Sequence, residues 1–367
     1  MNSARGVAIQ FVALAAFCTL VGSLAILVFG ITGPGQTGSE FGHLPFIDMW
    51  VRWDAGWYRG IVLDGYSYSP TAQSHAAYFP LYPMLMWPWV RLGIPADLVG
   101  IFVTFTAGLL GSLAFSAWVE RVRPGQHGLA LRLLLVWPFA YYLAGALYAD
   151  AMFFACTAAA FLFIERRVLW LSVLFAALAS AARPVGWAAV IGLVVREFEL
   201  TRREGKSLSL RNAVPLLGGF GLAAYMLFLQ LKFGDALAFI HTQVGWGQLT
   251  GDGAFKPALA QAKNLGDLVS PGLHLALCLA ALAAAWPMRR TLGWGYAAYV
   301  AVVLAVPLYV ARDFIGLGRY ALAAFPSFVV FADVLTARPR LKIAWFATSL
   351  VLLAIMTTRF AVGRYVS

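Results

Sequence analysis

Charged residues are scarce in this chain, yet several of them gather in one aromatic stretch. Only 12% of the 367 residues are charged, but the segment 48–64, DMWVRWDAGWYRGIVLD, holds three aspartates and two arginines. They are Asp48, Arg52, Asp54, Arg59 and Asp64. A carboxylate can act as a general base, and an arginine can bind phosphate through paired hydrogen bonds. The chemistry open to this segment therefore depends on the elements that hold it and on the side of the molecule where it lies.

The rest of the chain is strongly apolar. Hydrophobic residues make up 61% of it and its mean hydropathy is +0.78, whereas ordinary globular domains contain roughly 45–50% apolar residues. This composition predicts a single all-α polytopic membrane domain over residues 1–367. The formal net charge is +11, but the basic residues punctuate apolar runs instead of clustering on one soluble face, so no nucleic-acid partner is expected.

Apolar runs predict the transmembrane helices, because about 20 apolar residues are needed to cross the hydrocarbon core. About eleven such runs can be marked between charged breaks. They cover residues 7–31, 97–119, 128–147, 149–164, 168–182, 184–199, 213–232, 271–287, 292–311, 319–336 and 341–358. The run at 7–31 is longer than the 7–15 apolar residues of a signal peptide, so we expect a retained span. The runs from 128 to 199 are short and closely joined, which leaves a broken or re-entrant helix open there.

The basic residues predict the orientation of these helices. If the N-terminus is cytoplasmic, more than half of the 27 Lys and Arg residues fall in cytoplasmic segments, and the acidic residues show the opposite bias. We therefore expect a multi-pass protein of the cell (inner) membrane with an extracytoplasmic C-terminus. Two long loops, 32–96 and 233–270, then lie on the extracytoplasmic face, and we expect function to reside there.

The first long loop should carry interfacial helices. On a 3.6-residue period, the segment 50–63 forms an aromatic stripe that predicts a helix lying flat in the membrane interface. The stripe consists of Trp50, Trp53, Trp57 and Ile61. The next segment, AAYFPLYPMLMWPW, contains Pro80, Pro83 and Pro88, which predict an irregular backbone and the rim of a cleft.

Six segments carry a resemblance to a known family. RWDAGWYRGIVLDGY, followed by AYFPLYPML, resembles the signature of the PIG-V family, the second mannosyltransferase of GPI-anchor synthesis and its bacterial homologues. That family belongs to the GT-C superfold. YADAMFFACTAAAFLFIERR, AARPVGW, FGDALAFIHTQVGWG and GRYALAAFPSF resemble its later motifs in order. The chain departs from the family pattern at Asp150, where Glu is expected, and at Ala77 and Tyr78, where AFFP is typical.

The resemblance implies a glycosyltransferase, specifically a hexosyltransferase of mannosyltransferase type. Enzymes of the GT-C superfold use a sugar carried on a polyprenyl or dolichyl monophosphate, on the face away from nucleotide sugars. The implied reaction transfers that sugar with inversion to a hydroxyl of a glycolipid, glycan or protein, giving an α-mannoside. The sequence fits this expectation, because it contains no GxxxxGK[ST] phosphate loop. Membrane lipids are the remaining expected partners.

The resemblance also implies roles for single residues. It places the general base at Asp54, at the membrane surface where a lipid-borne sugar could reach it. Arg183 and Arg319, flanked by apolar spans near the outer boundary, are the candidates for binding the donor phosphate, and His241 is a weaker one. Ion pairs of these arginines with Asp150 or Asp313 are an alternative that stays open. Because arginine can cover a phosphate directly, neither a metal nor another cofactor is expected.

Further side chains are candidates for contact with substrate. They are Arg52, Trp53, Trp57, Tyr58, Asp64, His75, Tyr78, Asp150, Trp246 and Tyr320. The alternatives are an interfacial belt for the aromatic rings, a turn at Asp64 and a helix cap at Asp150. No metal site is expected, since Cys18, Cys156 and Cys278 lie in apolar runs and the histidines lack ligand spacing.

A second class of protein would share this composition. A polytopic transporter or a flippase for lipid-linked sugars is the alternative function. A transport pathway needs polar groups near the bilayer midplane. Here nearly all acidic and basic residues lie in loops or at the ends of apolar runs, which favours the enzyme.

Overall fold

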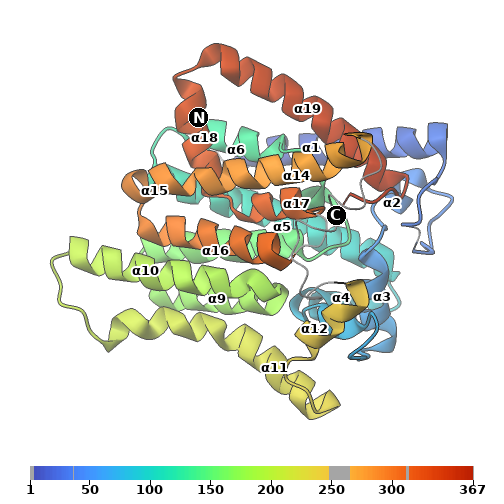
Figure 1. Ribbon diagram of the computed structural model, residues 1–367, viewed down its shortest axis with the longest axis horizontal. Helices are drawn as coiled ribbons and strands as arrows, with labels where there is room; N and C mark the ends of the chain where they lie inside the picture. Colours follow the sequence, from blue (N-terminus) through green and yellow to red (C-terminus); the bar gives the residue numbers. More distant parts are fainter. Residues whose placement is uncertain (1–3, 36, 248–264, 311–313, 367) are drawn as a thin grey trace.

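Helices connected by turns build the part of the chain that the structure describes. The computed structural model describes residues 4–35, 37–247, 265–310 and 314–366, and these contain no β-strand. The long helices lie side by side with roughly parallel axes, and short helices gather at one end of them, on the right of Figure 1. The all-helical expectation is therefore confirmed for the described residues.

Several helices are long and apolar enough to cross a membrane. In the described part of the chain, five segments meet that test by length and composition. They are α1 (Ala4–Phe29), α5 (Ala96–Val122), η3 (Leu210–Gly219) with α11 (Phe220–Phe233), the segment Ser270–Thr291 of α14 (Leu265–Ala283) with α15 (Ala285–Thr291), and α19 (Pro339–Ala361). A sixth is added if α17 (Leu317–Ala323) and α18 (Ser327–Thr336), which are bent by 86°, form one broken span. These helices indicate a membrane protein, and the count of eleven spans stays a prediction.

Shorter helices complete the bundle. They are α6 (His127–Leu135), α8 (Asp150–Glu165), α9 (Leu169–Ala182), α10 (Trp187–Arg203) and α16 (Trp294–Val310). Helix α8 packs between α5 and α9, and α10 packs against α16. Most side chains of α8 are buried, so this helix forms the centre of the bundle.

The expected run 128–147 is not one helix. Helix α6 ends at Leu135, and a short α7 (Tyr141–Ala144) follows after a break that contains Pro138. Proline lacks a backbone N–H and disfavours helical geometry in the residue before it. The broken helix that the sequence left open between 128 and 199 therefore lies here, and its irregular backbone is buried in protein.

The short helices come from the two long loops. The first loop forms α2 (Pro45–Asp48), α3 (Ala55–Asp64), η1 (His75–Ala77) and α4 (Leu81–Arg91), and the second forms α12 (Ala238–His241) and η4 (Thr242–Trp246). The two loops meet, because Ser74 Oγ and Thr242 Oγ1 lie 2.7 Å apart. Residues 248–264 of the second loop lie outside the described residues. The chain end joins this region, since the backbone of residues 32–35 donates hydrogen bonds to residues 362–363.

The aromatic stripe expected over 50–63 is wrong in its first half. Helix α3 begins only at Ala55, and Trp53 has a φ of 54°, which a right-handed helix cannot contain. Trp50 is buried against Gly145 and does not reach a membrane surface. The expectation that these tryptophans seat a flat helix at the interface therefore does not hold.

The irregular backbone expected from the three prolines is also wrong. Residues 81–91 form helix α4. Pro80 occupies its N-cap and Pro83 lies in its first turn, where backbone N–H groups have no intrahelical acceptor in any case. Only Pro88 lies inside the helix, at the loss of one hydrogen bond.

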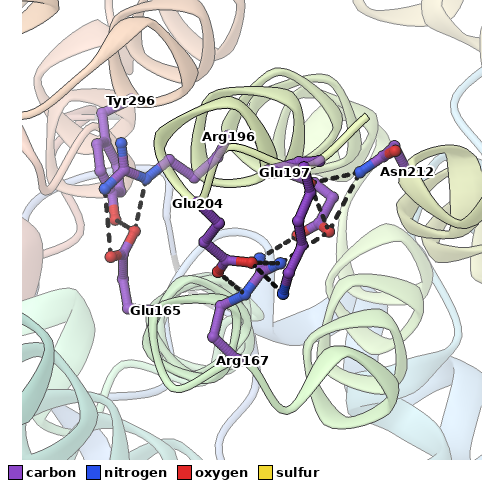
Figure 2. Close-up of polar contacts among 9 residues, drawn as sticks. Glu165, Arg167, Arg196, Glu197, Glu204, Asn212 and Tyr296 are labelled. Atoms are coloured by element: carbon purple, nitrogen blue, oxygen red, sulfur yellow. Dashed lines mark hydrogen bonds and ion pairs between the residues drawn. The ribbon is translucent and has the colours of Figure 1, made fainter. Parts of the chain in front are cut away.

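A cluster of ion pairs ties α8, α10 and α16 together at the end of the bundle away from the loops. In Figure 2 the Glu165 carboxylate accepts a hydrogen bond from Arg196 Nε at 2.6 Å and from the Tyr296 hydroxyl at 2.6 Å. Arg167 pairs with Glu197 at 2.5 Å and with Glu204 at 2.9 Å. Partnered in this way, the buried Arg196 and Glu197 avoid the cost of an unpaired buried charge.

Candidate active site

A cavity of about 540 Å³ lies where the two long loops cover the bundle. Its charged side chains come from four elements that are far apart in sequence. They are Asp54 of the first loop, Asp150 of α8, Arg183 between α9 and α10, and Arg319 of α17. The fold therefore brings together the candidate base, both candidate phosphate-binding arginines and Asp150.

Asp54 occupies the N-cap of α3 but does not cap it. An Asp at this position usually accepts a hydrogen bond from a backbone N–H of the first turn, and here no such bond forms. Its Oδ1 instead accepts a hydrogen bond from the Tyr78 hydroxyl at 3.2 Å, while its backbone N–H donates to the Tyr148 hydroxyl at 3.1 Å. The left-handed backbone of Trp53 directly precedes it. Asp54 thus makes no capping hydrogen bond, and Trp53 adopts a strained backbone conformation, where the Asp54 carboxylate turns into the cavity.

A break between two helices places Arg183. Helix α9 ends at Ala182, and Pro184 begins the 3-10 turn η2 (Pro184–Gly186). Because a residue before proline is pushed to extended geometry, Arg183 has φ −152° and ψ 150°. Its guanidinium hydrogen-bonds to Asp150 Oδ1 and lies over the Tyr320 ring, 4.6 Å from the ring centre.

A tight turn places Arg319. Gly316, with a φ of 99°, precedes the short helix α17, and the backbone N–H groups of Gly316 and Gly318 both donate to His274 Nδ1 at 3.2 Å. His274 is fully buried. It therefore fixes the first turn of α17, from which Arg319 reaches the cavity.

Arg319 is the central charge of the site. Its guanidinium lies 3.5 Å from Asp54 Oδ2 and 3.6 Å from Asp150 Oδ1. It also lies over the rings of Tyr142 and Tyr148, at 5.2 and 5.3 Å from their centres. Aromatic faces stabilise a cation that has left bulk water. The site can thus hold a guanidinium with only 10% of its side chain exposed.

The four charges alternate in sign along one chain of contacts. Asp54 contacts Arg319, Arg319 contacts Asp150, and Asp150 contacts Arg183. The ion pair with Asp150 that the sequence left open is thus formed by both arginines, and both also line the cavity. Asp313, the other partner considered, lies outside the described residues. Asp150 is the first residue of α8, and its carboxylate pairs with both arginines.

Aromatic rings form the loop side of the cavity. Trp57 stacks on Tyr78 with ring centres 5.7 Å apart and planes at 15°, and Trp246 contacts Trp57 at 5.6 Å. Tyr58 packs edge-on against Tyr78 at 5.2 Å. These rings contact one another and line the cavity. Flat aromatic faces beside a carboxylate can hold the apolar face of a sugar ring.

The electrostatic surroundings of Asp54 suit a proton acceptor. Burial raises its pKa above the usual Asp value, while the nearby Arg319 guanidinium opposes part of that rise. Its side chain keeps 32% of its surface exposed, so a ligand in the cavity can reach it. Burial and the neighbouring carboxylate hold the pKa of Tyr78 well above its usual range, so its phenol stays protonated and donates to Asp54.

Most of the residues expected from the sequence meet in this cavity. Besides the four charged residues, the lining includes Trp53, Trp57, Tyr58, Tyr78, Trp246 and Tyr320. Four others lie elsewhere: Arg52, Asp64, His75 and His241 do not line it. For these four the structure offers other roles.

Arg52 is a structural residue, contrary to the expected substrate contact. Its side chain is 1% exposed and pairs with Asp48 Oδ2 at 2.6 Å. Its Nε donates to the backbone oxygen of Ala361 at 2.8 Å, which ties the loop to the end of α19. Arginine carries five hydrogen-bond donors. The backbone and carboxylate oxygens of a buried loop junction can accept these hydrogen bonds as readily as phosphate oxygens can.

The other three lie outside the cavity for local reasons. Asp64 is exposed and is the last residue of α3, before Gly65 with its φ of 87°. This position agrees with the alternative prediction of a turn at Asp64. His75 accepts or donates a hydrogen bond with Ser67 at 2.8 Å and packs edge-on against Trp57; burial lowers its pKa. His241 pairs with Asp235 at 2.7 Å on the surface.

Some cavity residues are not among those predicted from the sequence. Tyr142, Tyr148, Gln73, Gln243 and Tyr365 touch Arg319 or line the cavity. Tyr148 carried a usable signal, because it stands two residues before Asp150 in a segment already singled out. A tyrosine inside an apolar run gives no such signal, since core aromatics look the same. Among the described residues, no three His, Cys, Asp or Glu side chains gather as a metal site would need.

Comparison with solved structures identifies the fold. The oligosaccharyltransferase of Archaeoglobus fulgidus in its apo form matches 97% of this chain with a TM-score of 0.50 and 11% identity. A complex of the archaeal oligosaccharyltransferase AglB from the same organism with an inhibitory peptide and a dolichol-phosphate matches 96% of the chain, with a TM-score of 0.37 and 12% identity. This chain spans 56% of the length of the first neighbour. No protein-family model matches the chain, and no curated protein matches it in sequence.

The class of protein follows from the fold. The apolar helices indicate a helical membrane protein, and its fold is similar to that of the archaeal oligosaccharyltransferase. At 11% identity this similarity carries the fold alone. The reaction and membership of the PIG-V family must be argued from the site.

Proposed function

We propose that this protein is an integral-membrane glycosyltransferase that takes a sugar from a polyprenyl-phosphate donor. The observation that carries the proposal is the cavity in which Asp54 faces a sugar-sized aromatic wall beside Arg319 and Arg183. The similarity in fold to an oligosaccharyltransferase supports it. The motifs that resemble those of the PIG-V family favour a mannosyl donor and a bacterial homologue of that family.

The proposed reaction is a single displacement at the anomeric carbon. An acceptor hydroxyl oxygen bonds to that carbon, the bond between the carbon and the phosphate oxygen breaks, and the hydroxyl proton passes to Asp54. The polyprenyl monophosphate leaves with one more negative charge than the donor carried. Arg319 and Arg183 stabilise that added charge, as paired guanidinium donors do for phosphate. Attack opposite the leaving group inverts the configuration, so a β-linked donor gives an α-mannoside.

Asp150 holds the two arginines for this task. It contacts both guanidinium groups, so they stay in the cavity when no donor is bound. The positive charges that meet the phosphate are then arranged before the reaction begins. Arginine covers a phosphate without a bound cation, and the proposed reaction uses no metal.

The positions of the charges disfavour a transporter or a flippase. Helix α8, at the centre of the bundle, carries Asp150 at its first residue and Glu165 at its last, with no charge between them. One end belongs to the cavity and the other to the ion-pair cluster of Figure 2. A transport pathway needs polar groups near the middle of the membrane. A site confined to one end favours chemistry at that surface, which we propose is the extracytoplasmic face.

The donor class can be tested directly. Purified protein is incubated with radiolabelled polyprenyl-phosphate mannose, polyprenyl-phosphate glucose or a nucleotide-linked mannose, together with total membrane lipids, glycans or proteins as acceptors. We expect labelled product from a polyprenyl-phosphate sugar and none from the nucleotide sugar. Transfer from the nucleotide sugar, or none from any lipid-linked sugar, would overturn the proposed donor class.

A further inference from the structure

An apolar groove lies between three helices of the bundle. Helices α1, α6 and α19 enclose about 620 Å³ there, and Leu14, Phe17, Leu135 and Leu350 are among the lining residues. In Figure 1 the N-terminus, where α1 begins, lies at the far end from α3, α4 and α12. The groove is therefore separate from the cavity described above.

Two polar side chains stand among these apolar residues. Gln10 lies six residues after the start of α1 and Arg132 five residues after the start of α6, so each lies about 8 Å along its helix. In the predicted topology, where both helices begin at the cytoplasmic surface, that depth corresponds to the region just beneath the membrane surface. Both side chains line the groove, which gives it one polar end.

The charge of Arg132 has no acidic partner within the described residues. Its Nε donates to the Gly128 backbone oxygen at 3.0 Å, its side chain is exposed, and it forms no ion pair. An unpaired arginine at membrane depth is costly unless it reaches a phosphate at the surface. The guanidinium of Arg132 is thus a cation in the groove that an anionic ligand can neutralise.

The amide of Gln10 is also incompletely paired. Its Nε2 donates to the Gly6 backbone oxygen at 3.1 Å, whereas its Oε1 is buried and accepts no hydrogen bond. A buried acceptor without a donor is costly. A ligand with a hydroxyl near its phosphate would satisfy this atom.

We propose that the groove binds an anionic phospholipid whose headgroup carries a hydroxyl, such as phosphatidylglycerol. Its phosphate meets Arg132, its headgroup hydroxyl donates to Gln10 Oε1 after a rotation of the amide brings that atom to the groove, and one acyl chain lies along Leu14, Phe17 and Leu350. Basic pockets between transmembrane helices bind anionic headgroups in this manner. This lipid site is independent of the proposed reaction, because it shares no residue with the active-site cavity.

The lipid site can be tested by native mass spectrometry of the full-length protein in detergent. Phosphatidylglycerol or phosphatidylcholine with the same acyl chains is added, and the fraction of protein with bound lipid is measured. We expect wild type to prefer phosphatidylglycerol, and Arg132→Gln to lose about tenfold in that preference, the value of one charge-assisted hydrogen bond. Arg290→Gln is the matched control, because Arg290 is exposed in α15 and does not line the groove.

A second variant tests the acyl chain. Ala13 lines the groove and is exposed, so Ala13→Trp fills the space without removing a charge. We expect it to reduce binding of both lipids, with circular dichroism equal to wild type. Equal retention of the two lipids by wild type, an unchanged preference in Arg132→Gln, or normal binding in Ala13→Trp would overturn the proposal.

Discussion

Arg319 links the candidate base to the rest of the site at the level of single residues. It contacts Asp54 and Asp150 at once and rests on two tyrosine rings. Arg183 contacts only Asp150 among the acidic residues of the cavity. Removal of Arg319 would therefore disturb both Asp54 and Asp150, whereas removal of Arg183 would disturb only Asp150. Both arginines are proposed to bind the donor phosphate.

Arg183→Gln and Arg319→Gln should weaken use of the lipid donor. Each removes a charge-assisted hydrogen bond, which corresponds to a rise of about tenfold or more in the donor KM. Steady-state rates at varied donor concentration measure the effect. Arg59→Gln serves as the control, because Arg59 pairs with Asp97 and does not line the cavity. An unchanged donor KM in both cavity variants would refute the phosphate assignment.

The rate of transfer should fall at low pH as Asp54 becomes protonated. Burial raises its pKa, so this fall should begin above the pH range of an ordinary aspartate. Arg319 holds the pKa down, and Arg319→Gln should therefore move the acidic limb of the pH profile to still higher pH. The profile of kcat/KM measures both effects. A limb that keeps its wild-type position in Arg319→Gln would contradict the coupling of these two groups.

At the level of single residues, the sequence predicts the charged residues of the cavity well and its aromatic residues poorly. Asp54, Arg183 and Arg319 could be selected because ionisable groups stand out in an apolar chain and the family resemblance ranks them. Arg52 was selected wrongly, since its buried pair with Asp48 leaves the same sequence pattern as an exposed cation. Tyr148 was missed although it stands two residues before Asp150 in a segment already singled out, whereas Tyr142 lies in an apolar run and is indistinguishable from core.

At the level of elements, the site depends on turns that interrupt helices. Arg183 follows the end of α9 and Arg319 lies in the first turn of α17, while Asp54 precedes α3. Each turn directs its charged side chain into the cavity. The short helix α17 is tightly packed, because a Cβ on Gly318 would lie 2.1 Å from the Phe139 ring.

Gly318→Ala should therefore destabilise the protein and displace Arg319. Overpacking of this kind costs about 1–3 kcal/mol. Thermal unfolding in detergent measures the loss, and the donor KM should rise with it. Gly219→Ala is the control, since nothing lies within 4 Å of its added Cβ and its φ of −74° suits alanine. Equal melting temperatures for Gly318→Ala and wild type would contradict the packing described here.

Sequence patterns predict the positions of most helices but not the details of the loops. Apolar runs match α1, α5, α8, α9, α11 and α19 closely, because length and apolarity decide them. Helix α4 was missed because its prolines occupy positions that tolerate them. The start of α3 was misplaced because the left-handed Trp53 is held by tertiary contacts, including its N–H bond to Gly35 at 3.2 Å.

On the scale of the whole molecule, the cavity and the ion-pair cluster lie at opposite ends of the same helices. The all-helical class could be predicted from composition. The two long loops contribute Asp54 and several aromatic rings to the cavity, whereas Asp150, Arg183 and Arg319 come from outside them. The number of membrane crossings could not, since several helices are too short to decide it by length. Orientation rests on the distribution of Lys and Arg alone.

Cysteine labelling in intact cells tests the orientation. Thr71→Cys lies exposed in the first long loop, and Ser207→Cys lies exposed near the ion-pair cluster. The three natural cysteines are buried, so background labelling should be low. A membrane-impermeant maleimide should label Thr71→Cys in intact cells and Ser207→Cys only after permeabilisation. The reverse pattern would invert the proposed topology.

The proposed reaction requires Asp54 to accept the proton of the acceptor hydroxyl. The most direct test compares the rate of sugar transfer from a polyprenyl-phosphate donor in Asp54→Asn and Asp64→Asn, two variants at the two ends of α3. Both should insert and melt like wild type. We predict that Asp54→Asn loses about 100- to 10,000-fold in kcat, the usual value of a general base, while Asp64→Asn keeps its activity. Wild-type transfer by folded Asp54→Asn would contradict the account.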